Sequence, residues 1–351
     1  MYYFMQDNLI KFISDSLDLE YKVNVITDGD FQTLVLYDGV ESVDYEIIDN
    51  HTFFKNSDLG SICAITSIVI PKTVTNINCY ALNKCKWLES IIVSEDNETY
   101  SSLDGVLYNK NKTKLCYVPP KVKLTELVLP DTVTEIDTNV FLDSLQSEND
   151  ETLITLLIHK DVTLINMGNC NVESIIVSED NETYSTQDGV LFNKDKTKLY
   201  RFPERSPLTE YEIPDTVTEI AERALNCCKN LKSVIIPSSV KRIGYMAFSH
   251  CMSLESVVIP DGITEIDYAT FEFCCNLKSV AIPNSVTIIK ENAFFGCSGL
   301  GSIVIPDNVI EIEERAFLYS GLKEVMVSKN TIIGKKTFEN NLFDEPKINY
   351  Y

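Results

Sequence analysis

The chain has 351 residues, of which 44% are hydrophobic, 52 are acidic and 30 are basic, so its formal net charge at pH 7 is −22. This hydrophobic fraction excludes a wholly disordered chain, and the acidic excess argues against nucleic acid and anionic membrane surfaces as partners. The sequence contains no run of about 18 apolar residues, so no membrane insertion is predicted.

Residues 1–58 are predicted to form an N-terminal cap made of a helix and a β-hairpin. Apolar residues recur at every fourth position, as in an amphipathic helix: Met5, Leu9, Ile13 and Leu17. The segment from Tyr21 to Tyr37 holds Asp28-Gly29 between two β-prone runs, which predicts the hairpin. Acidic residues among the first 20 positions do not match the basic and apolar pattern of a secretory signal peptide.

Residues 59–328 repeat with a period of 23, which is marked by Pro214, Pro237, Pro260, Pro283 and Pro306. The unit reads L-x-S-V-x-I-P-x-x-V-x-x-I-x-x-x-A-F-x-x-C-x-x. A unit this short cannot bury its own apolar face, so about eleven units are predicted to stack as coils of one solenoid. In each coil the S-V-x-I segment is expected to form a short parallel strand, which the proline ends because it lacks a backbone N–H.

Two longer units near 94–120 and 178–204 are near copies of each other. Each contains a β-prone run, an Asn-Lys-x-Lys-Thr turn and a second β-prone run, which predicts a hairpin insert that projects from one edge. Each begins with Ser-Glu-Asp-Asn-Glu. Because this segment lacks the alternating oxygen ligands and the glycine of a calcium loop, we interpret it as a solvated turn. The asparagine within it, Asn97 or Asn181, is interpreted as a polar turn residue. Residues 329–351 are predicted to form a C-terminal partial coil and tail, with the repeat register kept at Thr331 and Phe338.

The I-P-x-x-V-x-x-I-x-x-x-A-F-x-x-C-x-x-L unit, present at Pro237, Pro260 and Pro283, resembles the BspA-like leucine-rich repeat family. The D-G-V-L-[YF]-N-K-x-K-T insert at Asp104 and Asp188 is similar to the recurrent hairpin variant of that family. The resemblance covers about residues 59–338. It implies a leucine-rich repeat solenoid with short parallel β-strands on the concave face and irregular or short helical turns on the convex side. It also implies a surface or secreted adhesin that binds host matrix proteins or other cells, and it offers no catalytic residues.

Five of the eleven cysteines share one repeat position, 14 residues after the proline slot: Cys85, Cys228, Cys251, Cys274 and Cys297. Because no C-x-x-C pair or flanking histidine accompanies this column, its thiols are interpreted as small core residues rather than metal ligands. Cys227 and Cys275, beside the column, are expected to be exposed thiols. The histidines His51, His159 and His250 share no repeat position, and no glycine-rich phosphate loop is present. We therefore predict no enzyme activity, no cofactor and no metal.

Alternation along the strands sends two columns of side chains outward. One column is serine: Ser67, Ser90, Ser174, Ser233, Ser256, Ser279 and Ser302. The other is aliphatic: Val69, Ile92, Val128, Ile176, Ile235, Val258, Ala281, Val304 and Met326. An exposed aliphatic column would mark an interaction site. Alternatively, these residues are only good β-formers, or flanking side chains cover them. The candidate partner-binding residues are Ile92, Val128, Ile176, Ile235, Val258, Val304, Ser233, Ser256 and Ser279.

Charged residues flank these columns. Lys232, Glu255 and Lys278 occupy one position in consecutive coils, which predicts ion pairs across the ladder. Acidic residues follow several prolines, at Asp131, Asp215, Asp261 and Asp307, and favour a basic partner.

The sequence therefore predicts a non-catalytic, protein-binding solenoid, an adhesion or cell-surface interaction protein that contacts a protein partner through its strand face. The alternative is an intracellular scaffold or assembly protein that contacts its partners through coil ends or hairpins. The family resemblance implies a surface or secreted location. The lack of a recognisable export signal and the unpaired cysteines instead favour the cytoplasm.

Overall fold

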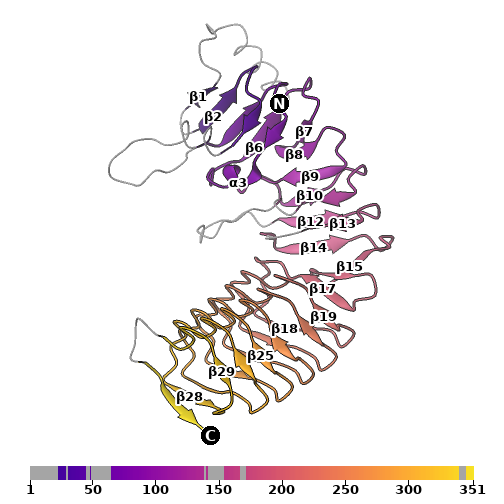
Figure 1. The fold of residues 1–351 in the computed structure, drawn as a ribbon. Helices are drawn as coiled ribbons and strands as arrows, with labels where there is room; N and C mark the ends of the chain where they lie inside the picture. The colour runs from indigo at the N-terminus through magenta and orange to yellow at the C-terminus, as the bar shows by residue number, and fades with distance from the viewer. Residues whose placement is uncertain are drawn as a thin grey trace. The chain divides into compact units, whose positions relative to one another are not determined.

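The computed structural model describes residues 23–28, 31–44, 48, 65–137, 140, 154–166, 171–339 and 345–351. The described residues form two compact units, the first up to Lys110 with Pro119–Val122, and the second comprising Asn111–Val118 and Lys123–Tyr351. Within each unit, short parallel strands of successive coils stack side by side (Figure 1). The predicted solenoid is therefore confirmed, with about eleven coils and very little helix in the described part of the chain.

The described part of the first unit contains a four-stranded sheet and a two-stranded ladder, together with the first strands of the first insert. In sheet order, the four strands are β1 (Val23–Asp28), β2 (Phe31–Leu36), β4 (Ser67–Ile70) and β6 (Ser90–Val93). The ladder joins β3 (Ser42–Val43) to β5 (Asn76–Ile77). β1 and β2 are antiparallel, so the predicted hairpin is present. The helix expected around Met5 to Leu17 lies outside the described residues. One short helix, α3 (Cys79–Leu82), begins after Asn78, whose side chain accepts a hydrogen bond from the Tyr80 amide.

The second unit carries the outward columns on three sheets, whose outward side we call the strand face. The first sheet consists of β10 (Glu126–Val128), β12 (Thr155–Ile158) and β14 (Ser174–Val177). The second consists of β18 (Glu210–Glu212), β20 (Ser233–Ile235), β22 (Ser256–Val258) and β24 (Ser279–Ala281). The third consists of β26 (Ser302–Val304), β28 (Glu324–Val327) and β30 (Lys347–Tyr350). β24 also contacts β26, so the second and third sheets are neighbours.

Coils in the described part of the chain also have a second strand, which the sequence predicted only in the two inserts, as the β-prone run after the Asn-Lys-x-Lys-Thr turn. These strands are β9 (Lys114–Tyr117), β11 (Glu135–Ile136), β13 (Leu164–Ile165), β17 (Lys198–Arg201), β19 (Glu219–Ile220), β21 (Arg242–Ile243), β23 (Glu265–Ile266), β25 (Ile288–Ile289), β27 (Glu311–Ile312) and β29 (Ile332–Ile333). They form parallel ladders of their own, which we together call the second ladder. Most have two residues, which is too short for an alternating pattern to be recognised in a sequence.

The interior follows the repeat. Leu254, Val257 and Ile259 are buried, as alternation predicts. The phenylalanines of the Ala-Phe position stack from coil to coil, with ring centroids 4.9–5.5 Å apart from Phe248 through Phe338. Burying such a side chain contributes roughly 1.5–3 kcal/mol, so this stack is a major part of the core. Phe338, after residue 328, is the last ring of the stack.

The turns on the side of the coil away from the strand face contain residues with left-handed backbone at fixed positions. Two such residues, four apart, occur in each of five consecutive coils: Arg223 and Cys227, Met246 and His250, Ala269 and Phe273, Asn292 and Gly296, and Arg315 and Tyr319. For a residue other than glycine this conformation costs roughly 1–2 kcal/mol. The tight turn that closes a 23-residue coil is therefore maintained by tertiary packing against local backbone preference.

Each insert begins with a strand that the sequence analysis missed. In the second copy, β15 (Tyr184–Gln187), β16 (Val190–Asn193) and β17 form an antiparallel meander. β15 and β16 are joined by Asp188-Gly189, both with positive φ, which is typical of a tight hairpin turn. In the first copy, β7 (Tyr100–Leu103) and β8 (Val106–Asn109) are joined in the same way. Val190, Leu191 and Phe192 are buried, so the hairpin packs into the solenoid, and the predicted projection is wrong.

The acidic residues that begin each insert lie in an exposed turn, as predicted, but the asparagine within that turn is buried. Asn97 is buried, and its Nδ2 donates to the carbonyls of Pro71 and Val74, at 2.8 and 2.9 Å. Its Oδ1 accepts from the amides of Thr99 and Tyr100, at 2.9 and 2.7 Å. Asn181 makes the corresponding four hydrogen bonds in the second copy. Each asparagine therefore ties its insert to the preceding coil.

Candidate protein-binding face

Five aliphatic residues form a continuous outward column on β20, β22, β24, β26 and β28, which we call the aliphatic stripe: Ile235, Val258, Ala281, Val304 and Met326. All five are exposed, with exposed fractions of 60% for Ile235, 66% for Val258 and 58% for Val304. Coverage by flanking side chains is therefore excluded in the stripe. Beside it, Ser256 and Ser279 are exposed and Ser233 is half-buried.

The remaining predicted members do not continue the stripe. Val128 and Ile176 are exposed on the first sheet of the strand face, with the half-buried Leu157 between them. Ile92 is half-buried and belongs to the first unit. The predicted column is therefore interrupted, which the repeat period alone could not show.

The inserts cause this interruption. The amide of Ile175 on β14 donates to the carbonyl of Gly189 at 3.0 Å, so the turn of the insert occupies the edge where the next strand would pair. Ile91 and Gly105 make the same contact at 2.9 Å in the first unit. A Cβ added to Gly189 would lie 2.7 Å from Ser174 Oγ, so glycine is required in the turn where it passes over the serine column.

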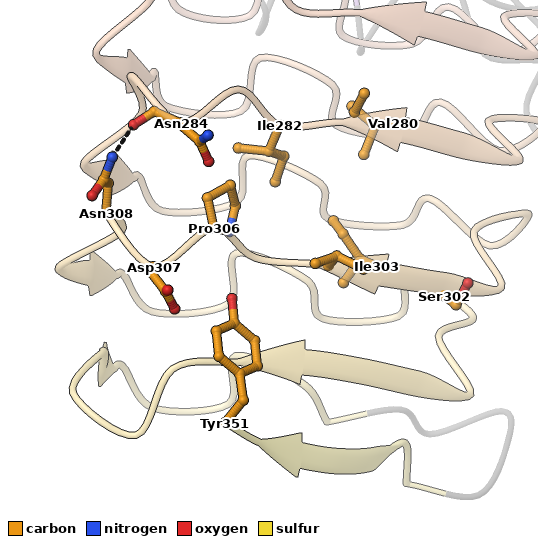
Figure 2. A pocket seen from close by; sticks show the side chains of 11 residues that line it. Val280, Ile282, Asn284, Ser302, Ile303, Pro306, Asp307, Asn308 and Tyr351 are labelled. Atoms are coloured by element: carbon orange, nitrogen blue, oxygen red, sulfur yellow. Dashed lines mark hydrogen bonds between the residues drawn. The ribbon is translucent and has the colours of Figure 1, made fainter.

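A hollow opens beside the stripe at Ala281, its smallest member. A pocket of about 690 Å³ lies there, lined by Ala281, Ile282, Val304, Pro306 and Tyr351 among others (Figure 2). The Tyr351 hydroxyl donates to the carbonyl of Ile305, which holds the ring at the edge of the pocket. The lining combines aliphatic side chains with polar ones, among them Asn284, Asp307 and Asn308. This hollow could not be predicted from the sequence, because Tyr351 lies far from Ala281 along the chain.

A family model for the BspA type leucine-rich repeat region matches the sequence in six copies, over residues 16–119, 47–141 and 218–344. The chain belongs to the BspA-type leucine-rich repeat family. Proteins with this type of solenoid are typically non-catalytic and take part in protein interactions.

Two solved structures share this BspA-type fold. A leucine-rich repeat protein from Eubacterium ventriosum is 21% identical, with a TM-score of 0.56 over 94% of this chain and 95% of that chain. The pneumococcal vaccine antigen PcpA is also 21% identical, with a TM-score of 0.54 over 92% of this chain and 88% of that chain. A search of curated proteins returns no match.

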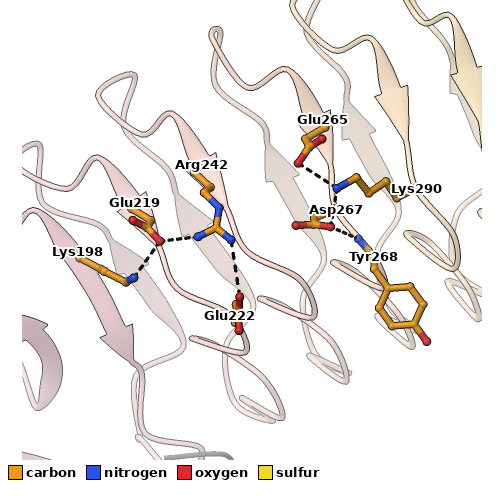
Figure 3. A network of polar contacts seen from close by, with 8 residues as sticks. All are labelled: Lys198, Glu219, Glu222, Arg242, Glu265, Asp267, Tyr268 and Lys290. Atoms are coloured by element: carbon orange, nitrogen blue, oxygen red, sulfur yellow. Dashed lines mark hydrogen bonds and ion pairs between the residues drawn. The ribbon is translucent and has the colours of Figure 1, made fainter. Parts of the chain in front are cut away.

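The second ladder of this BspA-type solenoid carries charges that neutralise one another (Figure 3). Glu219 Oε1 lies 2.9 Å from Lys198 Nζ and 2.6 Å from Arg242 Nη1. Lys290 Nζ lies 3.0 Å from Glu265 and 3.1 Å from Asp267. Burial alone would raise the pKa of Glu219, but hydrogen bonds and charge from Lys198 and Arg242 outweigh it and lower that pKa. Partner contacts on this ladder would have to compete with internal ion pairs.

On the strand face, one of the predicted ion pairs is present. Lys278 Nζ lies 2.5 Å from Glu255 Oε2, while Lys232 makes no ion pair with another described residue. The acidic residues that follow the prolines are all exposed: Asp131, Asp215, Asp261 and Asp307.

The cysteine column lies in the core of the BspA-type coils. Cys228, Cys251, Cys274 and Cys297 are buried, and burial raises the pKa of the Cys228, Cys274 and Cys297 thiols. Cys227 is also buried, which contradicts the expected exposure, and Cys275 is half-buried. Within the described ranges, no three His, Cys, Asp or Glu side chains are grouped so as to hold a metal ion.

The histidines do not form a catalytic arrangement in the part of the chain that the structure describes. Ser249 Oγ lies 2.8 Å from His250 Nδ1 and donates to Glu272 at 3.3 Å, so the hydroxyl separates the ring from the carboxylate, unlike the order of a catalytic triad. Burial lowers the pKa of His250. His159 Nε2 lies 3.0 Å from the Pro130 carbonyl, and His51 is outside the described residues. No described helix is long and apolar enough to cross a membrane.

Proposed function

We propose that this protein is a non-catalytic binding module that contacts a protein partner through the strand face of its second unit. The carrying observation is the aliphatic stripe, five consecutive coils that present exposed aliphatic side chains on one line. Contiguous exposed apolar surface of this kind is typical of interaction sites. A role in adhesion at a cell surface is the part of the proposal that the family resemblance suggests.

The distribution of residue types supports binding over simple strand propensity. Both outward columns belong to the same strands, so a preference for β-formers would act on both. One column is nonetheless serine from Ser233 to Ser302, while the other is aliphatic from Ile235 to Met326. This pattern fits a narrow apolar contact with a polar margin.

Contact through the hairpin inserts is less well supported. Val106, Leu107 and Tyr108, and the matching residues of the second copy, are buried and do not offer a projecting surface. The alternative of a scaffold that binds through its hairpins therefore lacks the feature that suggested it.

The proposal is tested with the double substitution Ile235→Glu and Val258→Glu. The matched control is Ile310→Glu with Ile332→Glu, which places the same charges on an exposed isoleucine of the second ladder and on one directly beside it. Both variants and the unchanged protein are used to capture proteins from the source organism and to bind a panel of extracellular matrix proteins. Circular dichroism confirms that each variant is folded.

We expect the stripe variant to lose partners that the control variant retains. An unchanged partner profile for the folded stripe variant would overturn the proposal.

A further inference from the structure

The last described coil of the second unit leaves part of the core uncovered. Three of its apolar side chains pack against the core but are only half-buried: Ile333, Phe338 and Ile348. Their neighbours one coil earlier are at most 1% exposed: Ile312, Phe317 and Val325. Each coil therefore completes the burial of the coil before it, and among the described residues no coil does so for the last one.

The strand face of this coil ends in an open strand edge. β30 is the outermost strand of its sheet in the described part of the chain. The Lys347 amide donates to the Lys323 carbonyl at 2.9 Å, and the Tyr351 amide also donates toward β28, at 3.3 Å. Because backbone groups alternate in direction along a strand, those of Ile348 and Tyr350 point away from β28. Outward N–H and C=O groups of this kind form a template for a further strand.

The sheet of the first unit has a second open edge at β1, which is its outermost described strand. The Thr66 amide donates to the Gln32 carbonyl at 2.9 Å, so the backbone groups of Gln32 face β4 and those of Thr33 face β1. Thr33 is paired with Ile26, whose backbone groups therefore face β2. Those of Thr27, the next residue, point away from the sheet.

The two edges differ in charge. From residue 328 onward, two described glutamates, Glu339 and Glu345, are outnumbered by four exposed lysines: Lys329, Lys335, Lys336 and Lys347. None of these lysines makes an ion pair with a residue that the structure describes. The sequence up to residue 30 has only Lys11 and Lys22 as basic residues and is rich in acidic ones: Asp7, Asp15, Asp18, Glu20, Asp28 and Asp30.

This difference decides which edges fit each other. Two β30 edges would bring two basic ends together, and two β1 edges would bring two acidic segments together. The β30 edge of one copy and the β1 edge of another instead join opposite charges, which favours that pairing over the two symmetric ones.

We propose that copies of this chain associate end to end, with β1 of one copy paired to β30 of the next. The added strand takes the outward hydrogen bonds of Ile348 and Tyr350 and covers the uncovered end of the core. Because the contact joins two different surfaces, every pair of copies still has one open edge at each end. The assembly therefore grows as a linear chain of copies, and it does not use the aliphatic stripe.

Matched substitutions at each edge test this pairing. Tyr350→Pro and Tyr350→Ala both remove the tyrosine ring, but only proline removes the outward N–H. Thr27→Pro and Thr27→Ala form the same comparison at β1. Proline is tolerated in an edge strand where the N–H points outward, and circular dichroism confirms that each variant is folded. If one proline variant does not fold, the pair of variants at the other edge still tests the contact.

Sedimentation velocity of the full chain measures the association. We expect the unchanged protein and both alanine variants to form assemblies that grow with protein concentration and shrink at high salt. Each proline variant alone should associate at least about tenfold more weakly than its alanine control, since a ladder hydrogen bond is lost and the ring blocks the edge.

A mixture of the two proline variants gives the sharpest result. Tyr350→Pro keeps an open β1 edge and Thr27→Pro keeps an open β30 edge, so the mixture should form a one-to-one dimer and nothing larger. A monomeric unchanged protein at every concentration, a mixture that stays monomeric, or a Thr27→Pro variant that associates as well as Thr27→Ala would overturn the proposal. None of these results affects the stripe experiment, so the two proposals can fail separately.

Discussion

The thiol of Cys274 donates a hydrogen bond to the backbone carbonyl of Phe248 in the preceding coil, with 3.1 Å between Sγ and the oxygen. The same contact links Cys251 to Leu225 and Cys297 to Phe271, at 3.0 and 3.1 Å. The Phe248 carbonyl oxygen also accepts a hydrogen bond from the Cys251 amide at 3.2 Å, so the Cys274 thiol donates to the second lone pair of that oxygen. The cysteine column therefore joins successive coils as well as filling space between them.

This contact predicts an unusual order of stability for two substitutions. Cys274→Ala should lower the free energy of unfolding by about 2 kcal/mol, because it leaves a cavity and removes the donor. Cys274→Ser should cost less, about 1 kcal/mol, because its hydroxyl keeps a donor beside the carbonyl. Chemical denaturation of both variants measures the difference. If serine is the more damaging substitution, the thiol acts only as a small apolar side chain.

Asn97 should be among the most sensitive polar residues of the first unit. Asn97→Ala should lower the free energy of unfolding by about 3 kcal/mol or more, because four backbone groups around a buried side chain each lose a hydrogen bond at once. The control is Asn111→Ala, at an exposed asparagine that, like Asn97, is followed two residues later by threonine. This substitution should change the free energy of unfolding by less than about 0.5 kcal/mol. Thermal unfolding of the two variants checks this, and equal effects would contradict the tie between insert and coil.

Lys336 offers a test of the strained turns. Its φ is 57°, and its side chain is exposed, so Lys336→Gly removes strain without removing buried contacts. We expect the free energy of unfolding to rise by about 1 kcal/mol. Lys335→Gly, at the exposed neighbour without a positive φ, should instead lower it by about 0.5 kcal/mol through the entropy of the unfolded chain. A loss of stability in both variants would contradict the strain argument.

The Lys198–Glu219–Arg242 network should stabilise the fold only above acidic pH. Because the folded-state pKa of Glu219 is lowered from 4.5, its contribution is present above that value and is lost as pH falls through the folded-state pKa. Glu219→Gln should cost less than about 1 kcal/mol at pH 7, since the network is partly exposed, and nothing at a pH below the folded-state value. Urea unfolding at several pH values checks this. A cost that grows toward low pH would contradict it, and the exposed Glu126→Gln serves as the control.

The sequence predicted the recurring burial pattern of the first strand in each coil, but not the second strands, which recur too but are mostly two residues long. Because the period repeats, alternation correctly placed Leu254 and Val257 inside, and Ile235 and Val258 outside. It could not predict features that occur once. A pocket of about 490 Å³ combines Asp188 from an insert with Glu212 from a coil, and the hollow at Ala281 needs Tyr351, which follows the last strand.

Local composition was misleading where tertiary contacts decide burial. Asn97 lies in a highly acidic segment that reads as solvated, yet its amide reaches two carbonyls of the previous coil. The first strand of each insert, such as Tyr184–Gln187, was missed because it is largely polar and is stabilised by its antiparallel partner.

The central claim is that a partner lies against the aliphatic stripe, and site-specific photo-crosslinking tests it most directly. A benzophenone side chain is introduced at the position of Val258, and in a second protein at the position of Ile310, which is similarly exposed but lies next to the second ladder. After irradiation in the presence of the captured partner, the account predicts a covalent adduct from position 258 and none from position 310. An adduct from position 310 with none from position 258 would contradict it.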